Sequence, residues 1–413
     1  MFFIVTLLQA QNDKLKDEKQ LGFTQFLHLV SQNNLEYAAE KINLQISEAA
    51  IQSAKIFPDP SLSFDWVENK SDQVRTGYGY TSELGTTIEL GGKRKARINL
   101  AKSEKELTQA LLDDYFRNLR AEAAILYIQT LKQVQLYEVK QNSYTTMKRL
   151  SESDSIRLSL GSIMQTDAVQ SKLEAGILLN ELLQAEVDMQ NSFSQLYLMA
   201  GISDAENQFS SLAKINSEVP LFDLNQLVLM AQDNRTDLEA ARFNKVVAAN
   251  ATDLTKKERR MDLDFKIAYS NEYFTPDTES AANSISAGVA IPLKFSNLYK
   301  GDIKMAKLYE KQSEKLYEHV QLKIKAEIKE AYQFYISAGK QVSNFENSLL
   351  NQSEEVLKGK VYSYERGETS LLEVLNAQRT YNDIQAAYIE TINTNLTALV
   401  ELEKVTGIWD LNF

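Results

Sequence analysis

The 413-residue sequence contains no cysteine, which excludes disulfide bonds, thiolate metal sites and cysteine nucleophiles. Its 2 histidines, His28 and His319, stand far apart, and no metal-ligand spacing surrounds either of them. Catalysis would require a base, a nucleophile or a metal in convergent geometry. Without cysteine and with two isolated histidines, the only candidate catalytic groups are the abundant acidic residues of the expected helices. We therefore predict that the protein is not an enzyme and that it holds no cofactor or metal of its own.

Only 5 prolines and 15 glycines occur, which favours long uninterrupted secondary-structure elements. No run of about 18 apolar residues is present, so the sequence predicts no transmembrane helix. The chain has 45 basic and 56 acidic residues, a net charge of −11, and shows no basic stripe. Nucleic acid is therefore not an expected partner, because binding it requires a positive surface.

The first ten residues, MFFIVTLLQA, are apolar and end in a small residue before Gln11. This pattern resembles the apolar part of a secretory signal, although the positively charged start is missing and the run is short. We interpret residues 1–10 as a truncated signal peptide. The alternative is an apolar first turn of a soluble helix.

The sequence repeats itself at an interval of about 205 residues. An alternating apolar run follows an aspartate in each copy, at a common offset of 203 residues: Asp59, Leu62, Phe64 and Trp66, then Asp262, Phe265, Ile267 and Tyr269. Matching glycines follow at an offset of 206 residues: Gly161 with Gly367, and Gly201 with Gly407. So small a drift indicates a duplicated structural unit. We predict a first repeat at 11–201, a linker at 202–222 and a second repeat at 223–413.

Each copy is expected to hold a helix, two strands, a very long helix and a shorter helix. In the first copy these elements are predicted at 22–55, about 61–68, about 78–90, 93–160 and up to 200. In the second copy they are predicted at 223–260, about 262–273, about 284–293, 301–364 and up to 407. The first long helix would extend for about 100 Å.

A helix of that length must be covered by neighbouring helices, in a bundle or in a tube built from several chains. Four alternating strands per chain cannot close a barrel and would leave open edges, whereas three chains would supply enough strands for closure. Alternation of apolar and polar residues suits a barrel with lipid outside and water inside. A soluble sheet with one buried face produces the same alternation, and this alternative stays open.

Four segments in order resemble the outer membrane efflux proteins, the TolC-like exit ducts, over essentially the whole chain. These segments are PDPSLSFDW, LGTTIELGGKRKAR, SAGVAIPLKF followed by GDIKMAK, and YERGETSLLEVLNAQRTY. The resemblance implies a mainly α fold with a small β part. It further implies a homotrimer with a 12-stranded outer-membrane β-barrel in outer-membrane lipid, continued by a periplasmic α-helical barrel. Such a duct exports passively what an inner-membrane pump of the resistance-nodulation-division type delivers through a periplasmic adaptor. The alternative is a soluble periplasmic coiled-coil scaffold or adaptor.

The GGKRKAR segment resembles the heavy-metal branch of this family, which implies metal cations as the exported substrate. Within it, Lys93, Arg94 and Arg97 follow the second predicted strand. They could bind neighbouring carboxylates at the periplasmic end of the barrel, or they could form a solvated positive first turn of the helix.

The resemblance places the inner end of the tube at the turns that contain Gly161 and Gly367. Glycine suits a left-handed backbone there, and Ser162 and Thr369–Ser370 are expected to cap the restarting helices. The residues implied to line the periplasmic aperture are Gly161, Asp167, Gln170, Gly367, Glu373 and Asn376. Those implied to contact the adaptor are Leu160, Ser162, Arg366, Glu368 and Thr369.

Asp167 and Glu373 repeated around a threefold axis would form a negative ring that favours cations. Asn376 stands where a second acid is expected, so the ring would be weaker than in other family members. The alternative is that both acids merely occupy the first turn of a helix, where the macrodipole favours them. Arg157 and Arg366 flank the turns and could pair with tip acids, contact the adaptor or remain solvated.

Overall fold

The computed structural model describes residues 20–71, 74–202, 211–212, 222–274, 281–294 and 298–409. The expected signal peptide and most of the expected linker at 202–222 lie outside these residues. The chain forms two compact units. Unit 1 comprises Met1–Ala39, Asp114–Arg235 and Leu322–Phe413, and unit 2 comprises Glu40–Asp113 and Thr236–Gln321. Each unit therefore combines segments of both sequence copies.

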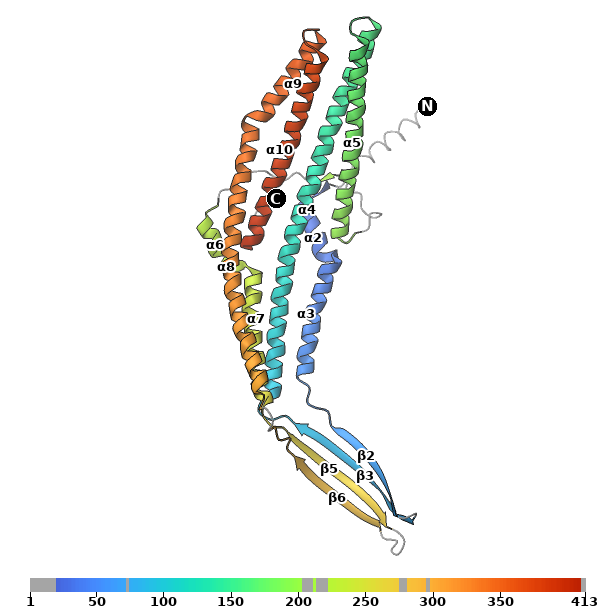
Figure 1. Cartoon of the computed structure of the whole chain (residues 1–413), viewed down its shortest axis with the longest axis vertical. Coiled ribbons are helices and arrows are strands. Elements are labelled where there is room, and N and C mark those ends of the chain that lie inside the picture. Colours follow the sequence, from blue (N-terminus) through green and yellow to red (C-terminus); the bar gives the residue numbers. More distant parts are fainter. Residues whose placement is uncertain are drawn as a thin grey trace, which may run out of the picture. The chain divides into compact units, whose positions relative to one another are not determined.

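Unit 2 contains a four-stranded antiparallel sheet of order β2-β3-β5-β6 (Figure 1). The strands are β2 (Ser61–Ser71), β3 (Val74–Ile88), β5 (Leu263–Phe274) and β6 (Ala281–Ala290). All four predicted strands are present, but several predicted bounds are wrong. β2 continues to Ser71 and not to 68, β3 begins at Val74 and not at 78, and β6 begins at Ala281 and not at 284. β3 ends at Ile88 and not at 90, because Gly91 and Gly92 turn with φ values of 78° and 74°. β6 ends at Ala290 and not at 293, because Pro292 has no N–H to donate.

One face of this sheet is apolar across all four strands. The register places Leu62 opposite Leu84, Leu84 opposite Ile267, and Ile267 opposite Ala287. The large side chains of this row are exposed. The other face is polar, and Lys266 Nζ lies 2.7 Å from Glu83 Oε1 on it. Strands β2 and β6 each pair on one side within the chain, so the sheet has two open edges and an uncovered apolar face.

The apolar face becomes aromatic toward one end of the sheet, the end at which β2 connects to β3 and β5 connects to β6. The rings of Trp66 and Tyr78 stack at 5.5 Å between centroids, and those of Tyr78 and Tyr273 at 4.9 Å. Tyrosine and tryptophan are typical of the boundary between a bilayer core and its head groups.

Four helices of unit 2 follow the order of the strands. They are α3 (Leu35–Ala54), the first part of α4 (Lys93–Ser159), α7 (Thr236–Glu258) and the first part of α8 (Lys300–Asn344). Lys105 of α4 lies 2.8 Å from Glu48 of α3, and Asn250 of α7 donates to the carbonyl of Asn99 at 3.4 Å. Lys245 of α7 lies over the ring of Tyr317 of α8. Helices α3 and α8 are therefore the open edges of this layer.

The junction between sheet and helices is tied by the basic segment that the sequence singled out. Lys93 is buried and lies 2.5 Å from Asp262, while Arg97 donates two hydrogen bonds to the carboxylate of Glu89, at 2.8 and 3.1 Å. Arg94 donates to the carbonyl of Lys55. Of the two interpretations of this segment, binding to neighbouring carboxylates is confirmed for Lys93 and Arg97.

Unit 1 is helical. It contains α2 (Phe23–Asn33), α5 (Gln165–Met199), α6 (Leu224–Asn234), α9 (Leu350–Glu365) and α10 (Leu371–Thr406), with the later parts of α4 and α8. A short parallel pair joins β1 (Gln20–Leu21) to β4 (Ser211–Leu212). Phe26, Tyr127 and Leu196 are buried in its main core. None of the described helices of the chain is both long and apolar enough to cross a bilayer.

Each copy was expected to begin with one helix, and in both cases the helix is broken in two. Asn34 separates α2 from α3, and Arg235 separates α6 from α7, both with extended backbone. Asn34 Nδ2 donates to the carbonyl of Met199 at 3.0 Å, and Arg235 donates to the equivalent carbonyl of Val405 at 2.9 Å. The breaks therefore hold the last helical turn of their own copy.

The closing glycines fit against these breaks. Gly201 and Gly407 have φ values of 65° and 73°. A Cβ on Gly201 would lie 2.2 Å from the carbonyl oxygen of Asn33, and a Cβ on Gly407 would lie 2.8 Å from that of Asn234. The left-handed backbone and the close approach both require glycine. The same contact in both copies supports the duplication inferred from the sequence.

The second long helix is also interrupted, where an unbroken helix over 301–364 was expected. A π-helical turn at Phe345–Leu349 separates α8 from α9. Tyr388 of α10 donates to Glu346 in this turn at 2.9 Å, and its ring lies 6.1 Å from that of Phe345. Periodicity does not reveal a single inserted residue of this kind, because the apolar pattern resumes after it.

Candidate functional site

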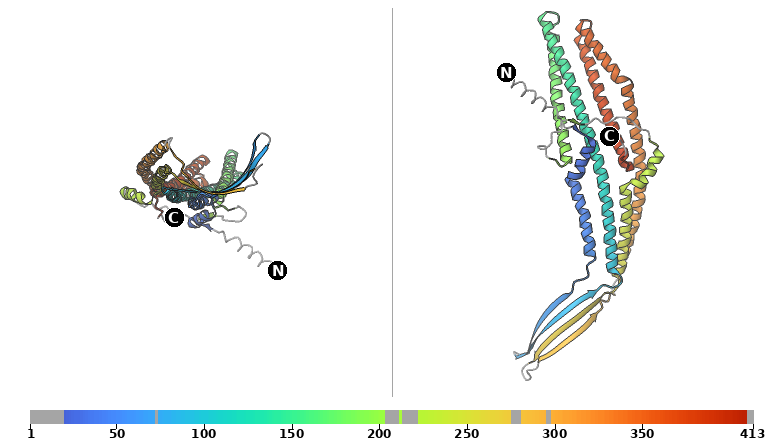
Figure 2. Two further views of the ribbon diagram at one scale, coloured as in Figure 1. Left: turned by 90° about the horizontal axis from the view of Figure 1, so that it is seen from below. Right: turned by 180° about the vertical axis from the view of Figure 1, so that it is seen from behind.

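Two helical hairpins of unit 1 form the candidate site. The first joins α4 to α5 and the second joins α9 to α10, and the hairpins lie side by side in both views (Figures 1 and 2). Their turns share one backbone pattern. The Ser162 N–H donates to the backbone carbonyl of Arg157 at 2.8 Å, and the Glu368 N–H donates to the backbone carbonyl of Ser363 at 2.9 Å.

The glycines of the two turns are required by backbone angle and not by crowding. Gly161 and Gly367 have φ values of 70° and 78°, which strain any residue with a Cβ. An added Cβ would meet no atom within 4 Å at either position. The predicted position of both turns is thereby confirmed.

The expected capping of the restarting helices is wrong. The N-cap residues are Met164 and Ser370, and neither side chain makes a capping hydrogen bond. Ser162 lies two residues too early to cap α5. The Thr369 side chain instead hydrogen-bonds to the carboxylate of Glu373, one turn further along.

The expected aperture residues lie in the first turns of α5 and α10. Glu373 forms an ion pair with Lys360 of α9 across the second hairpin. This contact, followed by the hydrogen bond from Thr369, holds the pKa of Glu373 below its usual value. Asp167 is half-buried, whereas Gln170 and Asn376 are exposed. Glu373 is therefore ionised but locally neutralised by Lys360, which the sequence did not indicate.

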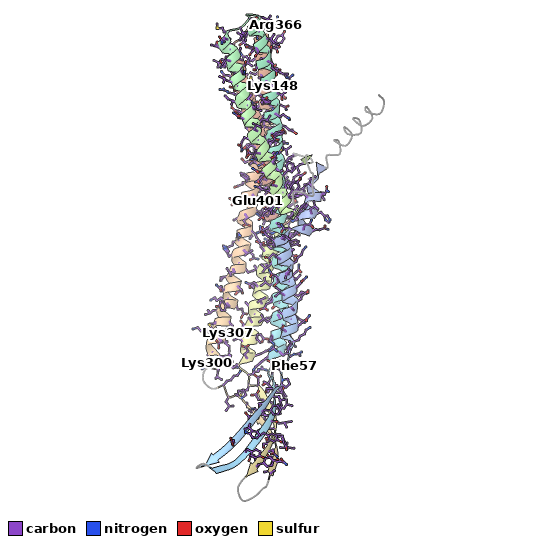
Figure 3. The ribbon with its side chains drawn as sticks, turned by 90° about the vertical axis from the view of Figure 1, so that its right-hand side faces the viewer. Phe57, Lys148, Lys300, Lys307, Arg366 and Glu401 are labelled. Carbon is purple, nitrogen blue, oxygen red and sulfur yellow. The ribbon has the colours of Figure 1, made fainter. Side chains whose placement is uncertain are left out.

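The residues expected to contact an adaptor lie at the turns themselves. Leu160 is a large apolar side chain that is 74% exposed. Arg366, labelled in Figure 3, lies 3.1 Å from Glu368 and also donates to the hydroxyl of Tyr362. Ser162 is exposed and Thr369 is half-buried. Pairing of Arg366 with a tip acid is thereby confirmed.

A buried pair that joins the two hairpins was missed from the sequence. Tyr364 of α9 donates to Asp154 Oδ1 of α4 at 3.0 Å, and Asp154 is fully buried. Arg157 lies 3.8 Å from Asp154 and over the ring of Tyr364. Burial, and then the charge of Asp154, raise the pKa of Tyr364. One signal was available, because Asp154 falls on the same helical face as Met147 and Ser151 and so on a buried stripe.

Further contacts join the hairpins around this pair. A buried apolar cluster combines residues of both: Met147, Ala175, Leu178, Tyr364, Leu371, Val374 and Leu375. Arg379 of α10 lies 3.0 Å from Glu174 of α5. Buried apolar contacts and charged pairs thus hold the two hairpins together.

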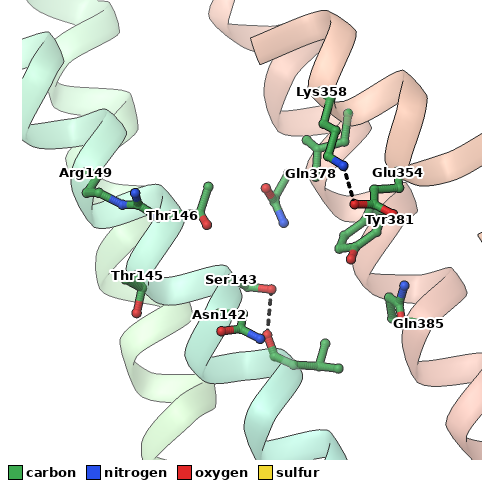
Figure 4. A pocket seen from close by; sticks show the side chains of 12 residues that line it. Asn142, Ser143, Thr145, Thr146, Arg149, Glu354, Lys358, Gln378, Tyr381 and Gln385 are labelled. Carbon is green, nitrogen blue, oxygen red and sulfur yellow. Dashed lines mark hydrogen bonds and ion pairs between the residues drawn. The ribbon is translucent and has the colours of Figure 1, made fainter. Parts of the chain in front are cut away.

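A polar pocket lies further along the same helices (Figure 4). Ser143 of α4 donates to Asn382 Oδ1 of α10 at 2.7 Å, and Gln378 donates to the same oxygen at 2.9 Å. Lys358 lies 2.5 Å from Glu354 on the α9 side of the pocket. Within the described residues no group of three or more histidines and acids could hold a metal ion. The pocket therefore offers hydrogen bonding and charge to whatever occupies it.

Comparison with known proteins shows what this chain is similar to. The family model described as outer membrane efflux protein matches residues 227–408. The chain is thus similar to the outer membrane efflux proteins across its second sequence copy. This family consists of channel proteins of efflux systems and not of enzymes, as expected from the sequence.

Relatives and solved structures cover nearly the whole length of this chain. The cobalt-zinc-cadmium resistance protein CzcC of Cupriavidus metallidurans is 23% identical over 385 residues, which are 92% of this chain and 88% of the relative. The structure of CusC has a TM-score of 0.76 at 15% identity and covers 94% of this chain and 92% of its own. The outer-membrane channel OprN has a TM-score of 0.76 at 15% identity, with 93% and 89% covered. The expected fold, mainly α with a small β part, is confirmed, and it is the fold of outer-membrane channel proteins.

Proposed function

We propose that this protein is the exit duct of a tripartite efflux system that exports metal cations. The observation that carries the duct is the sheet of unit 2, which exposes a complete apolar face and has open edges at β2 and β6. Closure of three sheets into one barrel pairs both edges and places the apolar face in lipid. A soluble periplasmic scaffold would leave this face in water, so the structure does not favour that alternative.

Metal cations are supported as the substrate class by relatives and by charge. CzcC carries cobalt-zinc-cadmium resistance in its name. The chain has 56 acidic and 45 basic residues, and a duct with an acidic interior raises the local concentration of cations. The duct needs no metal ligands of its own for this role, because a passive pathway must release what passes through it.

The hairpin turns are proposed as the inner end of this duct. Gly161, Asp167, Gln170, Gly367, Glu373 and Asn376 would line the aperture. Leu160, Ser162, Arg366, Glu368 and Thr369 would contact a periplasmic adaptor, which connects the duct to an inner-membrane pump of the resistance-nodulation-division type. The exposed Leu160 and the matched backbone of the two turns support this assignment. Asp154 and Tyr364 would hold the two hairpins of one chain together when the aperture is narrow.

The proposal is tested by deleting the gene and measuring growth in cobalt, zinc and cadmium, with complementation by the wild-type chain. Loss of tolerance to these ions, with unchanged tolerance to organic drugs, supports metal export. Unchanged metal tolerance and lost drug tolerance would assign another cargo to the same duct. The duct itself is tested independently by conductance of the purified protein in planar bilayers, where absence of channels would contradict it.

A further inference from the structure

The charge of unit 2 reverses where its helices meet its sheet. Four connections cross this junction, at 52–60, 91–98, 254–262 and 294–304. Together they contain twelve basic and four acidic residues, against the acidic excess of the whole chain. No basic stripe is visible in the sequence, because these residues come from four separate segments. The fold brings the four segments together at the junction between the sheet and the helices of unit 2.

Some of these basic residues form ion pairs or hydrogen bonds within the junction itself. Lys93 is paired with Asp262 and Arg97 with Glu89. Arg260 donates to the carbonyl of Gly91, and Lys294 donates to that of Glu258. These contacts explain the residues as ties between strands and helices, and they need no external ligand.

Of the other eight cations, Arg94 donates to the carbonyl of Lys55 and Lys257 pairs with Asp253. From the remaining six we name four the basic collar: Lys55, Lys95, Arg259 and Lys300. One belongs to each connection, all four are exposed, and none forms an ion pair within the part of the chain that the structure describes. Lys300, labelled in Figure 3, begins α8 directly after the last strand. The collar therefore marks the level at which the chain leaves the sheet.

Each collar cation has an exposed apolar side chain close to it in the sequence. Phe57 follows Lys55 and is 65% exposed, and Leu298 precedes Lys300 and is 44% exposed. Leu90 and Met261 accompany Lys95 and Arg259 and are also exposed. Alternation of cations with exposed apolar groups is typical of a membrane interface, where the apolar part enters lipid and the charge meets head groups. A dissolved polyanion would not require the apolar groups.

We propose that the basic collar binds the anionic head groups of phospholipids in the periplasm-facing leaflet of the outer membrane. The apolar face of the sheet ends at the collar, so the collar lies where the hydrocarbon core gives way to phosphate groups. Cations at this level attract acidic lipids, and three chains would present a ring of twelve. The inference does not depend on what the duct exports.

The alternative use of these cations, a contact with the next copy of the chain, has few acidic partners, because the connection after α3 holds one exposed acid, Asp59, against four collar cations. The open edges of the helical layer are α8 and α3, so α8 would face α3 of a neighbour. The acids of α3 are Glu36, Glu40 and Glu48. Only Glu48 lies in the half of α3 next to the sheet, and it is already paired with Lys105 at 2.8 Å.

A gradient along α8 gives the inference a distance scale. Lys300, Lys304, Lys307 and Lys311 follow one helical face, are exposed, and form no ion pair among the described residues. At 1.5 Å per residue, Lys304 lies about 6 Å from Lys300 along the axis, and Lys311 lies about 17 Å from it. Screening at physiological salt acts over about 8 Å, so Lys300 and Lys304 should contribute to lipid binding and Lys311 should not.

The test is a titration of the detergent-solubilised trimer with dioleoylphosphatidylglycerol or dioleoylphosphatidylcholine, followed by native mass spectrometry. One variant carries Lys55→Gln, Lys95→Gln, Arg259→Gln and Lys300→Gln. The matched control removes four exposed cations of unit 1 by Lys148→Gln, Lys172→Gln, Lys329→Gln and Lys340→Gln, and none of these forms an ion pair in the described residues. The single variants Lys300→Gln and Lys311→Gln test the gradient in a chain with nearly unchanged charge.

We expect the wild type and the control to bind phosphatidylglycerol about tenfold more tightly than phosphatidylcholine, with a preference that falls as salt rises. The collar variant should lose most of this preference, and Lys300→Gln should weaken it more than Lys311→Gln. Equal binding of the two lipids by the wild type, or equal losses in the collar and control variants, would overturn the inference. Displacement of phosphatidylglycerol by sn-glycerol 3-phosphate would point instead to a free-phosphate site. Binding of soluble peptidoglycan fragments in place of the lipid would point to the cell wall, and either result overturns the inference.

Discussion

The two copies of the repeat use the same backbone devices, but they secure them with different side chains. Asn34 in the first copy and Arg235 in the second both break a helix and donate to the last turn of their copy. Arg235 in addition lies 2.9 Å from Glu327, so the second break is charged. After duplication, the backbone positions were thus kept while the electrostatics diverged.

The hairpin turns show the same divergence. Gly161 and Gly367 adopt the same left-handed backbone within turns that share one hydrogen-bond pattern. The second turn carries the ion pairs Lys360–Glu373 and Arg366–Glu368. The first hairpin instead contributes the buried Asp154, to which Tyr364 of the second is hydrogen-bonded. The copies have therefore become complementary, and each difference can be tested by changing matched positions.

The largest difference is expected at the helix breaks. Arg235→Ala should lower the free energy of unfolding by about 3 kcal/mol, because it removes a buried cation that holds Glu327 and the carbonyl of Val405. Asn34→Ala removes two neutral hydrogen bonds, one donated to the carbonyl of Met199 and one accepted from the N–H of Tyr37, and should cost about 2 kcal/mol. Equilibrium denaturation of the detergent-solubilised protein measures both. As a control, Arg242→Ala removes an exposed pair with Glu239 and should cost less than about 0.5 kcal/mol. Equal losses at positions 34 and 235 would refute the electrostatic divergence of the breaks.

The link between the hairpins should give the next largest effect. Tyr364→Phe deletes a hydrogen bond to a buried carboxylate and should destabilise the hairpin pair by about 2 kcal/mol. We expect faster hydrogen exchange around Asp154 and a larger single-channel conductance. Tyr362→Phe is the control, because the Tyr362 hydroxyl contacts the exposed Arg366. Identical exchange and conductance in Tyr364→Phe and the wild type would show that the buried pair does not hold the hairpins together.

The pH dependence of this link follows from the pKa of Tyr364, which is raised by burial first and by Asp154 second. A raised pKa in the folded state means that the contribution to stability is complete below the ordinary tyrosine pKa of about 10. The contribution is lost only as the pH rises beyond that value, through the pKa of the folded state. Hydrogen exchange around Asp154 should therefore increase at strongly alkaline pH in the wild type and much less in Tyr364→Phe.

The glycine turns should behave alike, because their backbones match. Gly161→Val and Gly367→Val each place a β-branched residue at a positive φ and should cost about 1–2 kcal/mol. Export should fall in both variants, while trimers persist on gels because the sheet is untouched. Gly359→Ala is the control, since Gly359 lies inside α9 without a positive φ and alanine favours the helix. Normal export by Gly367→Val would remove the second turn from the proposed inner end of the duct.

These comparisons also show what the sequence could supply. The four strands, the long helix α4 and both turn glycines followed from alternation, from helical spacing and from glycine position. The breaks at Asn34 and Arg235 did not, because apolar periodicity continues across them and the cause is a distant carbonyl. Local sequence patterns predict secondary structure, whereas a tertiary hydrogen bond can override helix propensity at a single residue.

At the candidate site the same limit applies. Spacing placed Asp167 and Glu373 in the first turns of helices, where they are found. It could not show that Lys360 neutralises Glu373, because that pairing depends on how α9 and α10 face each other. Nor could it place Tyr364 beside Asp154, which is 210 residues away in the chain. Pairings between hairpins arise from packing and leave only a weak trace in the sequence.

The smallest effect on stability is expected at the exposed acids, where the readout is ion selectivity. Asp167→Asn removes one negative charge per chain and should reduce the preference for cations in planar bilayers. Glu373→Gln leaves Lys360 unpaired and should shift the reversal potential further toward anions. The double variant Lys360→Gln with Glu373→Gln restores the local balance and should return close to the wild type. Because Lys360 and Thr369 lower the pKa of Glu373, its carboxylate should stay ionised as the pH falls past the ordinary value of 4.5, and the difference in reversal potential between the wild type and Glu373→Gln should persist there. If Glu373→Gln and the double variant have the same reversal potential, Lys360 does not compensate Glu373, and the two turns differ less in charge than the structure indicates.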